Sequence, residues 1–209
     1  MKELVSRVNN IINLCWDSFS AKVGGGLIEV NKEASMQLHF AYILKNAADL
    51  VLYNKDEQVT IELETSIPVK GRLRECDIVI RIEKADRLYF LPIEMKCYKT
   101  KSASGGLRGA QDLFRYGIYE DLQLLENYCS ESILQGIQLT MTDSRNFIYP
   151  KSKVGKSWVY DISHGSSISQ ILSLDTPIGG KPVSVSLNKN YIFDWKQVGN
   201  YYFLQLKGI

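Results

Sequence analysis

Two carboxylates and a lysine make the segment from Asp77 to Lys96 the part of the chain best equipped for chemistry. Asp77 opens an apolar run, a short polar turn follows at residues 84–87, and a second apolar run ends on Glu94, Met95 and Lys96. Carboxylate oxygens are hard ligands of the kind that Mg²⁺ prefers. A lysine beside such an ion could act on a bound water. The segment therefore predicts a divalent-metal site at the edge of a β-sheet.

Strand parity decides whether these side chains meet. Residues 76–83 alternate, so that Cys76 and three isoleucines share one face and Asp77 lies on the other. If the turn from Lys84 to Arg87 holds an even number of residues, Asp77 lies opposite Glu94 and Lys96 joins them on one face. An odd turn would place Asp77 on the wrong side.

The charges allow two interpretations of this hairpin. Carboxylates directly opposed on neighbouring strands repel each other, which destabilises the sheet unless a positive charge lies between them. Mg²⁺ is one such charge, and Mn²⁺ could substitute for it. Lys96 alone is the other, and in that case the residues form a partly buried ion-pair cluster without catalytic function.

Helices on either side of the hairpin would position further polar groups. Residues 2–19 carry apolar side chains at helical spacing and form a scaffold helix. Asn31 is a suitable N-cap for a second helix that runs to about Leu52. Glu33 lies in its first turn and Gln37 follows on the same face. Glu33 either complements the helix dipole or takes part in catalysis, and both interpretations stay open.

Basic residues flank the hairpin on both sides. Residues 59–68 form a predicted strand, and Lys70, Arg72 and Arg74 then surround Gly71 in a turn that either is solvated or contacts phosphate. Beyond Lys96, the segment Lys99–Gly106 is a predicted polar loop, and residues 108–128 form a long predicted helix with Arg108 and Gln111 in its early turns.

The remainder of the chain predicts short strands. Residues 133–142 alternate as one strand, and residues 158–162, 182–187 and 201–206 predict further strands on the same sheet. Lysines and aromatic residues interleave between Tyr149 and Trp158, which suits nucleic-acid contact, although aromatic residues at strand ends more often belong to the core.

Composition narrows the function classes. The 209 residues are 45% hydrophobic and 23% charged with a net charge of +2, which predicts one α/β domain and no global basic field. The two histidines, His39 and His164, are too few for zinc or histidine-based catalysis. Four widely spaced cysteines without a signal segment predict reduced thiols in the cytoplasm. No apolar run is long enough to span a membrane.

The order of these elements resembles the PD-(D/E)xK nuclease superfamily, which has the restriction-endonuclease-like fold. The resemblance covers residues 31–142, and Cys76-Asp77 stands where the family has Pro-Asp. The helix around residues 109–126 is similar to the helix that follows the motif in bacterial members. The resemblance implies an α/β (α+β) fold in one domain. It has a central mixed sheet flanked by helices and a strand-rich extension at residues 143–209.

Carried over position by position, the resemblance implies a set of roles. Asp77 and Glu94 would be Mg²⁺ ligands, with the Met95 carbonyl as a further oxygen ligand. Lys96 would orient or deprotonate the attacking water and offset charge in the transition state. Glu33 would bind a metal-bound water or a second ion. The residues expected to contact the substrate are Gln37, Arg74, Lys99, Arg108 and Gln111.

The resulting hypothesis is a magnesium-dependent nuclease that hydrolyses phosphodiester bonds in DNA. A catalytically inactive nucleic-acid or protein-interaction module on the same fold is the alternative. RNA or a nucleotide as substrate also stays open, since the metal and lysine chemistry does not depend on the sugar. Paired cuts on duplex DNA would require a homodimer.

Overall fold

The computed structural model describes residues 1–101, 105–128, 130–169 and 171–209, and it is a mixed α/β structure built on one central sheet. The six strands lie in the order β1-β2-β3-β4-β10-β9. Only β3 and β4 are parallel, and the other neighbours are antiparallel. The bounds of these strands are β1 Glu57–Val69, β2 Arg72–Lys84, β3 Arg87–Tyr98, β4 Ile137–Thr142, β9 Lys196–Val198 and β10 Tyr201–Leu206.

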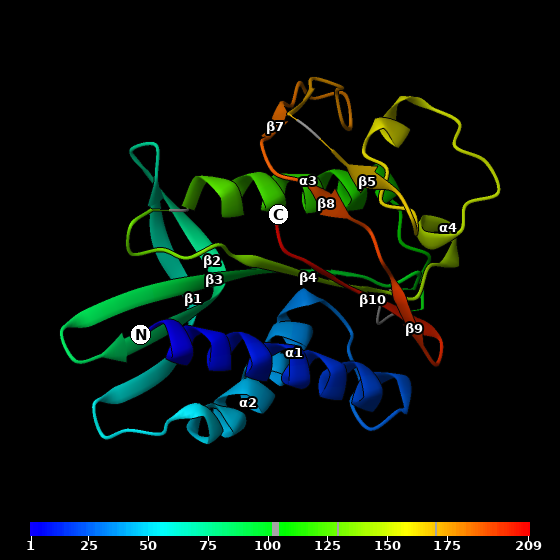
Figure 1. Ribbon diagram of the computed structural model, residues 1–209. Coiled ribbons are helices and arrows are strands. Elements are labelled where there is room, and N and C mark those ends of the chain that lie inside the picture. Colours follow the sequence, from blue (N-terminus) through cyan, green and yellow to red (C-terminus); the bar gives the residue numbers. More distant parts are fainter. Residues whose placement is uncertain (102–104, 129, 170) are drawn as a thin grey trace.

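Helices cover both faces of this sheet (Figure 1). The helices α1 (Lys2–Gly24) and α2 (Glu33–Ala47) pack on one face, and a short 3-10 helix η1 (Ala48–Val51) continues α2. The helix α3 (Gln111–Tyr128) lies on the other face. The predicted central sheet with flanking helices is therefore confirmed. None of the helices in the described part of the chain is long and apolar enough to cross a membrane.

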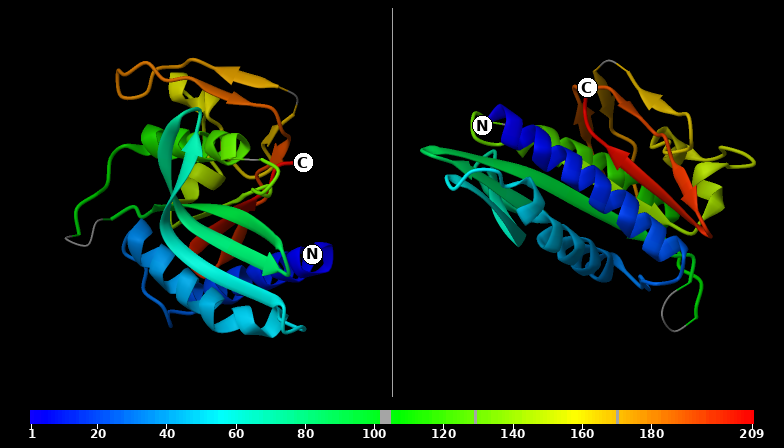
Figure 2. Two further views of the ribbon diagram at one scale, coloured as in Figure 1. Left: turned by 90° about the vertical axis from the view of Figure 1, so that its left-hand side faces the viewer. Right: turned by 60° about the horizontal axis from the view of Figure 1, so that its bottom comes forward.

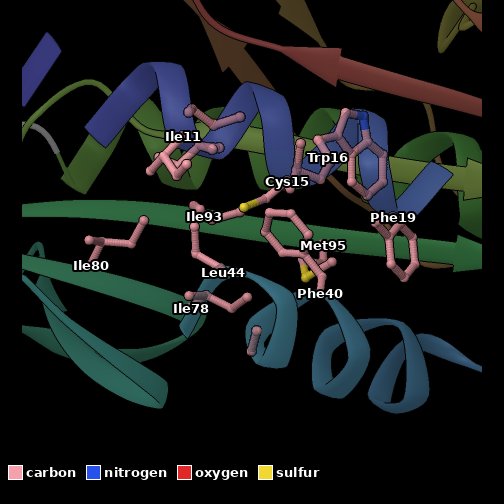
Figure 3. Packing of buried hydrophobic residues seen from close by; sticks show 14 of the residues in the cluster. Ile11, Cys15, Trp16, Phe19, Phe40, Leu44, Ile78, Ile80, Ile93 and Met95 are labelled. Atoms are coloured by element: carbon pink, nitrogen blue, oxygen red, sulfur yellow. The ribbon is translucent and has the colours of Figure 1, made fainter. Parts of the chain in front are cut away.

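The main hydrophobic core lies between the sheet and the pair α1 and α2. Alternate residues of β2 and β3 point into it, since a strand presents every second side chain to the same face. Figure 3 shows Ile78 and Ile93 facing Leu44 and Phe40, with Trp16 of α1 beside them. Removing this much apolar surface from water stabilises the fold by roughly 25 cal/mol per Å² buried. Because these apolar side chains face α1 and α2, the opposite face of β2 and β3 is left for polar groups.

The turn between β2 and β3 has the even count on which the predicted site depends. Lys84 pairs with Arg87, so Ala85 and Asp86 form the turn, and the ladder continues to Ile78 opposite Ile93. Ala85 takes the left-handed conformation that a tight two-residue hairpin requires (φ 50°). The predicted parity is confirmed.

Cys76 does not share the face of the isoleucines, which corrects the predicted alternation. It packs with Val79, Leu125 and Tyr128 on the α3 side, whereas Ile78 belongs to the opposite core. The change coincides with a break in β1–β2 pairing at Glu64, whose φ of 51° turns the partner strand. The strand therefore twists beside Asp77, at the position where the candidate site begins.

Several element boundaries differ from the predicted ones. Lys32, not Asn31, is the N-cap residue of α2, because the helix begins at Glu33. The Ser35 hydroxyl accepts hydrogen bonds from the main-chain N–H groups of both Asn31 and Lys32. The helix α3 starts three residues after Arg108, following a left-handed Ala110 (φ 59°). In the predicted loop Lys99–Gly106, residues 102–104 lie outside the described residues, as does Cys129.

The C-terminal part only partly extends the central sheet, which is a second correction. The strands β9 and β10 join it, but four others form two separate two-stranded sheets beside α3 (Figure 2). Residues 158–162, predicted as a strand, instead begin in a 3-10 helix. The bounds are α4 Arg145–Ile148, η2 Lys156–Val159, β5 Ser167–Ile168, β6 Leu172–Leu174, β7 Val185–Leu187 and β8 Tyr191–Ile192.

Candidate active site

A hydrogen bond across β2 and β3 holds the Asp77 carboxylate in place. The regular ladder ends at Ile78 and Ile93. Just beyond it, the main-chain N–H of Met95 donates to Asp77 Oδ2 (2.6 Å). A hydrogen bond from a main-chain N–H group to a carboxylate is charge-assisted and therefore short. Asp77 is thereby fixed beside Glu94, as the register predicts.

Glu94 is almost completely enclosed, with 5% of its surface exposed. The Tyr128 hydroxyl of α3 donates to Glu94 Oε1 (2.9 Å). Burial, reinforced by the negative charge of Asp77, raises the pKa of Glu94 to about 7. Burial also raises the pKa of Asp77 to about 6, with a smaller contribution from the Glu33 charge. Two carboxylates held this close thus create a region of concentrated negative charge.

Lys96 lies between carboxylates from two helices on opposite sides of the sheet. Its Nζ is 3.7 Å from Glu33 Oε1 of α2 and 3.4 Å from Asp121 Oδ2 of α3. The lysine stem passes Gly117 of α3, where a Cβ would lie at an ordinary contact distance of 3.6 Å from the Lys96 Cε atom. The ammonium group is therefore held by charges on two separate elements.

The protonation state of Lys96 follows from these neighbours. Burial lowers the pKa of the ammonium group, but the nearby carboxylates, led by Asp121 and then Glu33, raise it above its ordinary value. Lys96 is therefore a cation in this arrangement. Of the three predicted roles, orienting a water molecule and offsetting negative charge fit this state, whereas removing a proton from water does not.

Glu33 reaches the site from the first turn of α2. One of its carboxylate oxygens accepts the main-chain N–H of Cys97 (3.1 Å), and the other faces Lys96. It stabilises the start of α2 through its position and also contacts β3. Glu33 therefore combines the two interpretations that the sequence left open: it lies at the helix N-terminus and within the candidate site.

Gln37 lies one turn along α2 and connects β1 with β2. Its Nε2 group donates to Glu64 Oε1 (2.7 Å) and to the Asp77 carbonyl oxygen (2.7 Å). Both amide hydrogens are thereby engaged within the protein. In this structure Gln37 supports the main chain at Asp77, whereas the sequence predicted a substrate contact.

Three residues of this site were not predicted from the sequence: Glu64, Asp121 and Tyr128. Asp121 is 5% exposed, and burial raises its pKa well above the ordinary value although Lys96 lowers it. Its spacing from Gly117 and Tyr128 places all three on one face of α3. An aspartate among the buried apolar residues of this helix is the sequence signal that could have identified it.

The remaining predicted substrate residues lie around the site or away from it. Lys99 donates to the Tyr201 hydroxyl (3.0 Å), and Arg108 donates to the Asn31 carbonyl oxygen (3.0 Å). Both charges reach the end of β3, where they lower the pKa of Cys97 against the larger effect of burial. Arg74 is exposed on β2 beyond Asp77, and Gln111 lines a separate cavity at the start of α3.

The chemistry of the donor groups fits a hard divalent cation. Asp77, Glu94 and Glu33 supply carboxylate oxygens, and the pKa values of the first two are raised mainly by burial, which a bound cation would counteract. The arrangement of these side chains in space does not yet form a complete set of metal ligands. Over the described ranges of the chain, no group of three His, Cys, Asp or Glu side chains is arranged to hold a metal ion.

Comparison of the chain with models of protein families, with curated proteins and with solved structures finds no match. The geometry of these carboxylates and of Lys96 is therefore the basis for any functional assignment.

Proposed function

We propose that the protein is a magnesium-dependent nuclease that hydrolyses phosphodiester bonds in DNA, with a restriction-endonuclease-like core of the PD-(D/E)xK type. The observation that carries this proposal is the position of Lys96. Its ammonium group lies between Glu33 and Asp121, beside two carboxylates that are fixed across β2 and β3. A cation next to a pair of buried carboxylates suits the hydrolysis of an anionic ester.

Asp77 and Glu94, with Glu33 and the Met95 carbonyl, are the groups that would hold Mg²⁺. When bound, the ion supplies a Lewis acid and lowers the pKa of a coordinated water. Lys96 orients the attacking water and offsets the negative charge that develops on the phosphoryl oxygens. Asp121 positions Lys96 through its ion pair, and Tyr128 positions Glu94 through its hydrogen bond.

Exposed basic residues support a nucleic acid as the substrate. The β1–β2 hairpin extends past Asp77, and at its end Lys70 in the turn and Arg72 and Arg74 at the start of β2 are all exposed. Lys99 and Arg108 add positive charge near the end of β3. Phosphate contacts of this kind supply much of the affinity for a nucleic acid. DNA and RNA share this chemistry, so both are tested as substrates.

Nicking of supercoiled plasmid DNA tests the proposal. With Mg²⁺ the wild-type protein converts the plasmid to the open circular form, and EDTA abolishes the conversion. Asp77→Asn and Lys96→Ala each lower the rate by about a hundredfold or more, the effect of removing one electrostatic group from such a site. Lys45→Ala, which removes an exposed lysine from α2, is the matched control and retains activity. Full activity in both site variants would overturn the assignment.

A parallel assay with single-stranded RNA identifies the preferred sugar. Cleavage of RNA alone would move the assignment from a DNA nuclease to a ribonuclease that uses the same residues. Direct linearisation of the plasmid, without an open circular intermediate, would indicate paired cuts and hence a homodimer.

One observation favours a second function, a non-catalytic nucleic-acid or protein-interaction module. In the described residues, one oxygen of each of Asp77, Glu94 and Glu33 already accepts a hydrogen bond from the protein, and no group of three is arranged to hold an ion. Calorimetry distinguishes the two functions. A nuclease binds Mg²⁺ at millimolar concentrations and loses this binding in Asp77→Asn, whereas the module shows no Mg²⁺ binding.

A further inference from the structure

Apart from the carboxylate site, a polar cavity of about 500 Å³ lies where α3 begins. It is open to solvent and is formed by the first turns of α3, by α4 with the segment that follows it, and by η2. Its lining includes the polar and charged residues Gln111, Asp112, Arg115, Lys151 and Ser157, together with Trp158. None of these residues contributes to the carboxylate site around Lys96. The cavity therefore needs an explanation of its own.

Arg115 is the unusual residue in this cavity because it is a buried cation without an anionic partner. Its exposed fraction is 4%, and one guanidinium nitrogen donates to Ser157 Oγ (2.6 Å). The guanidinium group stacks over the Trp158 ring, 4.3 Å from its centre. Its Nε atom is buried and has no hydrogen-bond acceptor. Among the described residues, Arg115 forms no ion pair within 4.0 Å.

Leaving a guanidinium group in this state is unfavourable, since buried charges are normally paired and hydrogen-bonded. Burial lowers the pKa of Arg115, and the more distant carboxylates of Asp112 and Asp161 oppose this effect only in part. Asp112 accepts the main-chain N–H of Leu113, and Asp161 pairs with Lys153. Asp112 also lines the cavity, but in the described residues neither carboxylate forms an ion pair with Arg115 within 4.0 Å.

Two further features make the cavity favourable for an anion. Lys151 is exposed at its rim and forms no ion pair within 4.0 Å in the described part of the chain. The N-terminus of α3, an 18-residue helix, contributes the positive end of its dipole. The planar guanidinium group matches the geometry of phosphoryl oxygens, and its stacking on Trp158 holds it in place.

We propose that this cavity binds a phosphoryl group, with Arg115 as the main ligand and Lys151 as a second cation. The group is either a backbone phosphate of a nucleic acid or a free phosphate monoester. The first source rests on the proposed nuclease function. Arg115 and Asp121 are six residues apart, roughly 9 Å along the helix axis and about 120° apart around it, so a strand that reaches both sites has to pass around α3.

Trp158 provides a direct readout for this proposal. It is partly exposed beside Arg115, whereas Trp16 and Trp195 are buried. Its fluorescence is followed while inorganic phosphate, or an unphosphorylated oligonucleotide in EDTA, is added to the full chain. We expect a saturable change with phosphate that is absent in Trp158→Phe. Tighter binding of the oligonucleotide identifies a backbone phosphate as the ligand, and binding of phosphate alone identifies a free monoester.

Matched variants test the assigned residues. Arg115→Lys removes the fork and weakens binding about tenfold or more, and Lys151→Ala weakens it about fivefold, as expected for an exposed charge. Lys156→Ala removes an exposed lysine that does not line the cavity, and it leaves the affinity unchanged. Asp77→Asn also leaves the phosphate affinity unchanged, so this result is independent of nuclease activity.

Two outcomes would overturn the proposal. One is a fluorescence change that does not saturate with either probe. The other is an equal affinity in wild type and in Lys151→Ala, a variant of an exposed side chain that decides the question even if Arg115→Lys fails to fold.

Discussion

The main-chain N–H of Met95 and the carboxylate of Asp77 form a hydrogen bond of 2.6 Å at the point where the β2–β3 ladder ends. This hydrogen bond holds a carboxylate of β2 against the main chain of β3, beside Glu94. Because Glu94 and Lys96 share a face of β3, the single hydrogen bond brings all three functional groups together. The predictions below follow from the charges that this arrangement concentrates.

The first prediction concerns pH and stability without metal. The folded-state pKa values of Asp77 and Glu94 are raised to about 6 and about 7, above their ordinary values of 3.8 and 4.5. The folded state therefore binds these protons more tightly than the unfolded state. The resulting stabilisation is present at about pH 4 and is lost as the pH rises to about 8.

Urea unfolding in EDTA measures this effect. We expect Asp77→Asn to be more stable than wild type at pH 8 by about 2 kcal/mol, and the difference to disappear near pH 4. Glu120→Gln, an exposed change on α3, should follow the wild-type profile. A wild-type protein and an Asp77→Asn variant with the same dependence on pH would contradict the burial of this charge.

The second prediction concerns Asp121 as a positioning residue. Asp121→Asn removes the ion pair with Lys96 and should lower kcat about tenfold or more with little change in KM, since it alters the lysine and not the substrate contacts. Asp121 is also the leading charge that raises the pKa of Lys96. Its loss should shift the alkaline limit of activity to lower pH. Glu120→Gln, one residue away and exposed, is the control, and an unshifted alkaline limit would contradict the assigned role.

The third prediction concerns two glycines that differ in the space available for a Cβ atom. Gly117→Ala places a Cβ 3.6 Å from Lys96 Cε, an ordinary contact, so it should raise the free energy of unfolding by about 0.5–1 kcal/mol through helix propensity and retain activity. Gly136→Ala would bring a Cβ within 2.8 Å of the Pro92 carbonyl oxygen, which belongs to the main chain of β3. We expect a loss of about 1–3 kcal/mol from overpacking. Thermal unfolding that shows the same change for both variants would contradict this packing.

The fourth prediction concerns the basic end of the β1–β2 hairpin. Arg74→Ala should weaken DNA binding and reduce the slope of log K against log salt by about 0.9 for duplex DNA, the effect of losing one phosphate contact. Lys55→Ala removes an exposed lysine before β1, at the other end of the hairpin, and should leave the slope unchanged. Equal slopes for Arg74→Ala and wild type would show that this turn is solvated and makes no phosphate contact.

The sequence predicted the hairpin well because parity is a local property. Counting through the turn at Ala85 and Asp86 was sufficient to place Asp77 beside Glu94, with Lys96 on the same face as Glu94. Asp121 was missed because its role depends on how α3 is rotated against β3. The periodicity of one helix does not determine which partner each of its faces meets.

The errors nearer the C-terminus have a different cause. Residues 158–162, Trp-Val-Tyr-Asp-Ile, are mostly apolar, and a short strand was predicted there. In the structure Tyr160 and Ile162 are buried against α3 and its neighbours without joining a sheet. An irregular segment can bury every second side chain just as a strand does, so a short apolar segment does not distinguish the two. Cys76 was misplaced because the turn of the chain at Glu64 has no signature in the sequence.

The central claim is that Asp77, Glu94 and Glu33 form one metal site beside Lys96. A crystal structure of the protein soaked with Mn²⁺, with anomalous scattering used to locate the ion, tests it most directly. The account predicts an anomalous peak within ligand distance of Asp77 and Glu94 that is lost in Asp77→Asn, where an amide replaces the carboxylate. The absence of any peak at these residues, with Mn²⁺ at millimolar concentration and the carboxylates still bonded to Met95 and Tyr128, would contradict it.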